Sequence, residues 1–93
     1  MKFRKKPVII DAFLVCELIE CFKHNFKELP ECVREAYENT TINTITDNDF
    51  KVKTLEGEYV ATKEDYLIRG VQGELYPCKI DIFNKTYERV EED

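Results

Sequence analysis

The stretch PVIIDAFLVCELIECFKHNFKEL, residues 7–29, changes its hydrophobic period halfway and thereby decides the fold class. In its first part, alternate positions are apolar, as expected for a strand with one buried side. These positions are Val8, Ile10, Ala12 and Leu14. From Val15 onward the apolar residues recur every three or four positions, which indicates one face of a helix. They are Val15, Leu18, Ile19, Phe22, Phe26 and Leu29. We therefore expect a strand over 7–14, with Pro7 at its edge, and then a helix over 17–28.

The residues after this stretch predict a second helix and then hairpins. Pro30 ends the first helix and can open the next one, whose buried face would contain Val33, Ala36 and Tyr37 before residues 39–41 stop it. Alternating apolar residues and glycine-containing turns then predict strands. The predicted strands cover 50–55, 58–61, 66–69 and 74–78, and they are followed by a helical turn over 80–85 and an edge strand over 86–90. This order indicates an α+β fold, a small antiparallel sheet with an N-terminal strand and a two-helix insertion packed on it.

Length, composition and charge narrow the function classes. The 93 residues predict a single domain over 1–93, with the helical insertion at 14–40 and antiparallel strands over 42–91. No apolar run approaches the roughly 18 residues that a membrane span needs, and no signal-peptide pattern follows the start, so we expect a cytosolic chain with reduced thiols. The net charge of −5 argues against direct binding of nucleic acid and favours a basic protein as the partner.

Acidic side chains concentrate in the predicted helices. Six glutamates accompany Lys23, Lys27 and Arg34 in residues 17–38, namely Glu17, Glu20, Glu28, Glu31, Glu35 and Glu38. A DNA mimic would need longer rows of one sign, because DNA carries a charge every ~1.7 Å along its axis. We therefore expect these partner-binding residues to face a basic patch on a protein. Two further polar groups, residues 47–49 and 62–65, are typical of solvated turns.

The cysteines and the single histidine form a possible metal-ligand set. Cys16, Cys21, His24 and Cys32 follow the pattern C-x4-C-x2-H-x7-C, and Cys78 competes for the fourth position. Thiolates and imidazole suit a structural Zn²⁺, which would also stabilise so small a domain. On a straight helix Cys16 and Cys21 would diverge by about 140°, so four of these five residues can meet only if Cys16 precedes the helix. The alternatives are burial of the thiols in the core and a nucleophilic Cys21 with His24 as its base.

Both ends of the chain resemble a known family. The opening MKFRKKPVIIDAF and the segment TLEGEYVATKEDYLIRGVQGELYPCKIDIFNKTYERVE, residues 1–13 and 54–91, resemble small phage and prophage proteins of Gram-positive bacteria. The block RGVQGE-x-YPCK-x-DIF-x-x-TYE is specific to them. Family members usually have glycine where this chain has Glu64 and proline where it has Ile80, so these two turns can differ.

The resemblance implies a phage-encoded antagonist of host defence. The chain looks like an anti-CRISPR protein of the type II-A group, which would bind the type II CRISPR effector nuclease in the host bacterial cytoplasm and block target-DNA binding or cleavage. No catalytic residue is implied, and the sequence contains no glycine-rich phosphate loop, HExxH or serine elbow, so we expect a non-enzyme. The alternatives are a sponge that sequesters a nucleotide immune signal and a structural phage protein.

Overall fold

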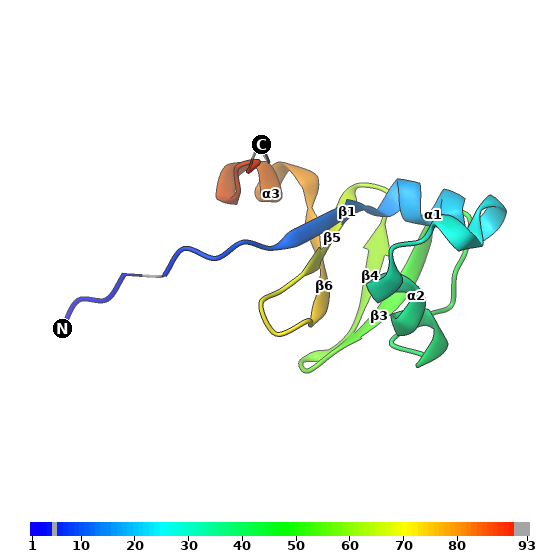
Figure 1. Ribbon diagram of the computed structural model, residues 1–93, viewed down its shortest axis with the longest axis horizontal. Coiled ribbons are helices and arrows are strands. Elements are labelled where there is room, and N and C mark those ends of the chain that lie inside the picture. Colours follow the sequence, from blue (N-terminus) through cyan, green and yellow to red (C-terminus); the bar gives the residue numbers. More distant parts are fainter. Residues whose placement is uncertain (5, 91–93) are drawn as a thin grey trace.

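The computed structural model describes residues 1–4 and 6–90 (Figure 1). Position 5 and residues 91–93 lie outside this description, and with them the last position of the strand region predicted over 42–91. The elements in chain order are β1 (Asp11–Leu14), α1 (Val15–His24), η1 (Phe26–Glu28), α2 (Glu31–Glu38), β2 (Ile42–Asn43), β3 (Asp49–Thr54), β4 (Gly57–Thr62), β5 (Asp65–Arg69), β6 (Leu75–Lys79) and α3 (Ile80–Thr86). None of the helices within the described residues has the length and apolar character of a membrane span.

The strands form two antiparallel sheets of three strands each. The first sheet has the order β1-β5-β6 and the second has the order β2-β3-β4. The α+β class with an N-terminal strand in a sheet is therefore confirmed, although the strands divide into two sheets. The division occurs at the turn between β4 and β5, because these consecutive strands contact each other without sharing a hydrogen-bonded ladder.

The main core lies between the two sheets and the helical segment. Its fully buried members include Val15 and Ile19 of α1, Val33 of α2 and Phe50 and Val52 of β3. Strand β3 supplies two of them because its alternate side chains point inward at period two. The prediction for the second helix is confirmed at Val33 and Ala36 and is wrong at Tyr37, which is 42% exposed.

Both boundaries of the first predicted helix are wrong. Helix α1 begins at Val15, directly after β1, so Cys16 lies in its first turn. It ends at His24, because Asn25 has the non-helical angles φ −141° and ψ 59°, and the 3-10 turn η1 follows. The strand before it covers Asp11–Leu14 only, because the ladder with β5 begins where Asp11 pairs with Arg69.

The outer face of the first sheet is covered by α3. Paired residues of neighbouring strands share a face, so Tyr66 and Cys78 both point away from the main core. Phe83 of α3 packs on Tyr66, with ring centroids 4.2 Å apart, and Tyr87 stacks on Phe83 at 4.8 Å. The edge strand predicted over 86–90 is wrong, because α3 continues to Thr86 and Tyr87 joins this aromatic stack.

Two turns of the second half follow from local hydrogen bonds. The β5–β6 turn is closed by the Gly70 N–H, which donates to the Glu74 carbonyl, and by the Gln72 N–H, which donates to Glu74 Oε2. Gly73 adopts φ +83°, a conformation that glycine favours. The turn predicted over 62–65 is confirmed, since Thr62 Oγ1 accepts from the Glu64 N–H, but Asp65 is not solvated: its buried carboxylate accepts from the Thr62 N–H at 2.9 Å.

Candidate functional site

The six glutamates of the helical segment are all exposed, and the structure divides them into two groups. Those near Cys21 come from α1 and η1, and we call them the α1 cluster, residues Glu17, Glu20 and Glu28. Those on α2 recur at positions i, i+4 and i+7 and therefore form one stripe, the α2 stripe, residues Glu31, Glu35 and Glu38. The sequence predicted the six residues but not their separation into two groups.

Few cations neutralise these carboxylates. Among the described residues, the only Lys, Arg or His side chain within 4 Å of any of the six is that of His24, whose Nε2 lies 3.9 Å from Glu20 Oε2. Lys23 of the same helix instead contacts Asp47, at 3.1 Å, in the loop before β3. The two acidic groups therefore remain available to an external cation.

An aromatic cluster holds the helical segment against the second sheet. The Phe22 ring lies 5.9 Å from Phe50, 5.3 Å from Tyr37 and 6.3 Å from Phe26, measured between centroids. These rings join α1, η1, α2 and β3, in tilted or edge-on arrangements that favour aromatic attraction. Packing of these rings therefore contributes to the position of the helical segment.

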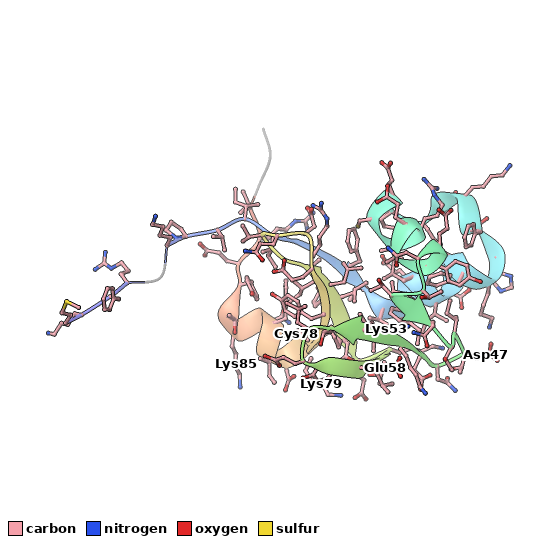
Figure 2. All side chains as sticks on the ribbon, turned by 90° about the horizontal axis from the view of Figure 1, so that it is seen from below. Asp47, Lys53, Glu58, Cys78, Lys79 and Lys85 are labelled. Atoms are coloured by element: carbon pink, nitrogen blue, oxygen red, sulfur yellow. The ribbon has the colours of Figure 1, made fainter. Side chains whose placement is uncertain are left out.

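The residues predicted to bind zinc lie in different surroundings. Cys21 and Cys32 pack against the main core, whereas Cys78 points to the opposite side of the first sheet, near α3 (Figure 2). His24 is exposed beside Glu20. Cys16 lies inside α1, contrary to the condition that it precede the helix. Among residues 1–4 and 6–90, no group of three or more His, Cys, Asp or Glu side chains is arranged to hold a metal ion.

The environments of the thiols favour their neutral form. Partial burial raises the pKa of Cys21, and the nearby carboxylate of Glu28 raises it further. Burial likewise raises the pKa of Cys32, although Arg69 acts in the opposite direction. Burial and then Asp65 raise the pKa of Cys78. Because the thiolate is the nucleophilic form, these surroundings do not activate the three thiols as nucleophiles. Cys21 and Cys32 pack against the main core, and Cys78 lies on the outer face of the first sheet.

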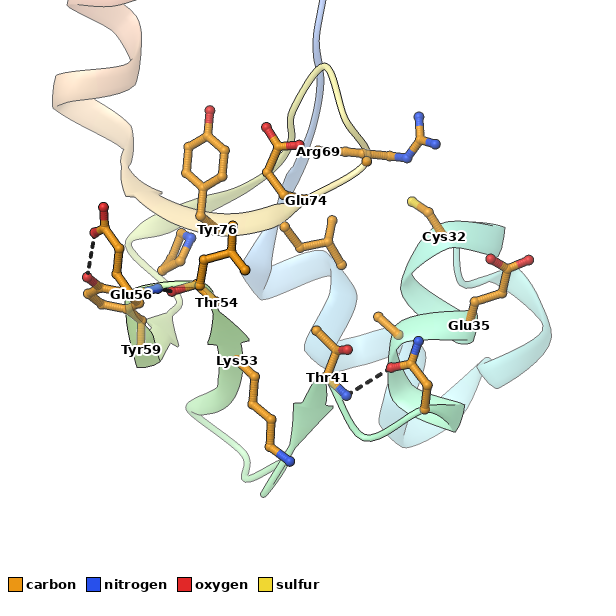
Figure 3. A pocket seen from close by; sticks show the side chains of 16 residues that line it. Cys32, Glu35, Thr41, Lys53, Thr54, Glu56, Tyr59, Arg69, Glu74 and Tyr76 are labelled. Carbon is orange, nitrogen blue, oxygen red and sulfur yellow. Dashed lines mark hydrogen bonds between the residues drawn. The ribbon is translucent and has the colours of Figure 1, made fainter.

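A cleft opens between α2 and the ends of the two hairpins (Figure 3). Its volume is about 840 Å³, and its charged lining residues are Glu35 of α2, Lys53 and Glu56 of the β3–β4 hairpin, and Arg69 and Glu74 of the β5–β6 hairpin. The sequence alone does not predict this cleft, because its walls come from segments that meet only in the folded chain.

The polar groups in the cleft are partly engaged with one another. The Tyr59 hydroxyl donates to Glu56 Oε2 at 3.2 Å, which raises the pKa of Tyr59. Arg69 Nη1 lies 3.8 Å from Asp11 Oδ2, outside the cleft. Two cations and three carboxylates line a partly apolar hollow that includes Ala36 and Leu75. This lining can hold a small polar molecule, but its charge balance does not favour a multiply charged anion.

No protein-family model, curated protein or solved structure shows significant similarity to this chain.

Proposed function

We propose that the chain is a non-enzymatic, phage-encoded anti-CRISPR protein that acts in the host bacterial cytoplasm. It binds the type II CRISPR effector nuclease and blocks target-DNA binding or cleavage. The sequence resemblance supplies the class of protein. The contact surface is the pair of acidic groups on the helical segment, the α1 cluster and the α2 stripe.

The observation that carries this proposal is the unpaired state of these carboxylates. Within the described residues, His24 is the single Lys, Arg or His side chain within 4 Å of any of the six carboxylates, and Lys23 of α1 is engaged by Asp47. Exposed charges of one sign steer a partner of the opposite sign and make the encounter sensitive to salt. A nuclease that holds nucleic acid presents basic channels, which are the complementary surface.

The experiment is inhibition of target-DNA cleavage by the purified chain at increasing molar ratio to the nuclease. We expect inhibition that saturates near a stoichiometric ratio and weakens at high salt. Replacement of all six glutamates by glutamine should weaken binding roughly 20-fold, if each exposed pair contributes about 0.3 kcal/mol. A control replaces three exposed acids outside the helical segment by glutamine, namely Glu56, Glu64 and Glu88, and is compared with the three-glutamine variant of the α2 stripe, which removes the same number of charges.

Two results contradict the proposal. Absence of inhibition at a large molar excess removes the assigned function. Inhibition that the control variant weakens as much as the three-glutamine variant of the α2 stripe does would place the contact surface elsewhere.

The size of the cleft, but not its charge balance, supports a second candidate, a sponge for a nucleotide immune signal. Its volume of about 840 Å³ lies within the range of small-molecule sites. Cyclic nucleotides should then raise the melting temperature of the chain, and Arg69→Gln should reduce that effect. A structural role in the phage particle predicts instead that the chain is found in purified virions.

A further inference from the structure

The first strand lies at an open edge of its sheet. Strand β1 pairs with β5 on one side, and the described residues place no strand on its other side. The elements in contact with β1 are β5 and α1, which continues directly from it. An uncovered strand edge presents backbone N–H and C=O groups that another strand can bind.

The residues before β1 continue its direction away from the body of the protein, as Figures 1 and 2 show. We call residues 6–10 the N-terminal arm. The β1–β5 ladder begins only at Asp11, and no backbone hydrogen bond outside the ladders joins the arm to the rest of the described chain. The arm is therefore extended without a strand partner.

The composition of the arm suits a strand with a partner. Val8 is 47% exposed and Ile9 is 78% exposed, and both are β-branched residues that favour strands. Pro7 precedes them and limits the length over which pairing can continue. A projecting apolar segment joined to an open edge indicates a contact with another chain.

Antiparallel pairing of β1 with the β1 of a second copy satisfies both features at once. Such a pair has two-fold symmetry, the commonest arrangement of protein dimers. If the symmetry axis passes where the Ile10 residues of the two copies lie opposite each other, the arm of each copy lies along the partner's β1 and reaches the start of the partner's α1. The two first sheets then become one sheet of six strands, in the order β6-β5-β1-β1-β5-β6.

The charges agree with this arrangement. Lys6 and Arg4 are exposed on one copy, and this register brings them to the first turns of the partner's α1. The partner's Glu17 and the partner's Glu20 are exposed there. We propose that the chain forms a two-fold symmetric dimer through β1 and the N-terminal arm. The dimer does not depend on the function proposed above.

Sedimentation velocity of the full chain over a range of concentrations tests the dimer. We expect a species of twice the chain mass, and we expect Ile9→Asp to raise the dissociation constant at least tenfold. Leu55→Asp is the matched control, because Leu55 is fully exposed at the tip of the β3–β4 hairpin, and it should leave the dissociation constant unchanged. Circular dichroism confirms that both variants are folded.

A charge exchange tests the register. Arg4→Glu should weaken the dimer, and the double variant Arg4→Glu with Glu17→Arg should restore at least half of the lost affinity. A wild-type chain that stays monomeric at the highest concentration overturns the proposal. A dimer that tolerates both Ile9→Asp and Arg4→Glu overturns it as well, because its interface would lie elsewhere.

Discussion

Replacing Phe22 with alanine removes the side chain that connects the helical segment to the second sheet. Its ring contacts Phe26 of η1, Tyr37 of α2 and Phe50 of β3. After the replacement, the remaining three rings keep one contact, that between Phe26 and Tyr37 at 5.6 Å. The change therefore separates the aromatic contribution to the position of the helices from every contribution of the cysteines.

The expected loss follows from burial and ring contacts. Truncation of a fully buried phenylalanine costs roughly 3–5 kcal/mol. Phe22 is half-buried, which lowers that cost, but it loses three aromatic contacts of about 0.5–1.5 kcal/mol each. We expect a decrease of about 3 kcal/mol in the free energy of unfolding. A domain of this length has a total free energy of unfolding of roughly 5–14 kcal/mol. Because a loss of 1 kcal/mol lowers the melting temperature of such a domain by about 4–8 °C, the melting temperature should fall by about 12–24 °C.

The assay is thermal and urea unfolding followed by circular dichroism, applied to a graded series. Phe50→Ala, at a fully buried ring, should cost more than Phe22→Ala. Phe26→Ala, at a ring 39% exposed, should cost less, and Leu55→Ala, at a fully exposed side chain, should change stability by under about 0.5 kcal/mol. If Phe22→Ala costs no more than Leu55→Ala, the aromatic cluster does not hold the helices and the reasoning is refuted.

Three further predictions concern the buried carboxylate, the tyrosine of β6 and the metal. Asp65→Ala leaves the Thr62 N–H without its acceptor and should lower the free energy of unfolding by about 2 kcal/mol in urea titrations. Burial, and then the Tyr87 hydroxyl, raise the pKa of Tyr76 to about 12. The free energy of unfolding should therefore fall as the pH rises from about 10, the ordinary pKa of tyrosine, to about 12. Tyr87→Phe should shift the tyrosinate absorbance of Tyr76 to lower pH. The structural zinc stays a prediction from residue type. Metal analysis that finds about one zinc per chain, with unfolding on chelation, would support it, and a ligand set that includes Cys16 would require Cys16 to leave α1. Essentially no zinc would leave Cys21 and Cys32 as core-packing thiols.

Local signals predicted most of the fold. The β3–β4 hairpin follows from alternating residues around a glycine turn, and Gly57 adopts φ +127° there. The predicted start of the helix is two residues too late, because α1 begins at Val15 directly after β1, with no turn between them. The predicted end of the same helix is too late, because the apolar spacing continues through Phe26 to Leu29, whereas the helical backbone ends before Asn25.

Non-local features could not be predicted in the same way. The cysteine pattern specifies ligand types, but the direction of each thiol depends on which face of a sheet or helix it occupies. Cys78 points to the face of the first sheet opposite the core, and no short-range pattern records that face. The cleft between α2 and the hairpins arises for the same reason, from contacts between distant segments.

The block that carries the resemblance has a structural explanation in this chain. Its glycines and Glu74 build the β5–β6 turn, and its aromatic residues Phe83 and Tyr87 cover the outer face of the first sheet. These residues therefore maintain the scaffold, and the acidic groups proposed to bind the partner lie in the part of the chain outside that block.

The pairing of β1 with β5 has a consequence for the order in which the chain folds. Leu14 precedes its ladder partner Tyr66 in the chain, so during synthesis β1 must wait until β5 has been made. The β3–β4 hairpin and the helices involve near neighbours in sequence and can form earlier. Closing the long loop between β1 and β5 is then the slow step, since its entropy is lost before the first sheet contributes any stability. We therefore expect substitutions in β1 to speed unfolding while leaving the folding rate almost unchanged.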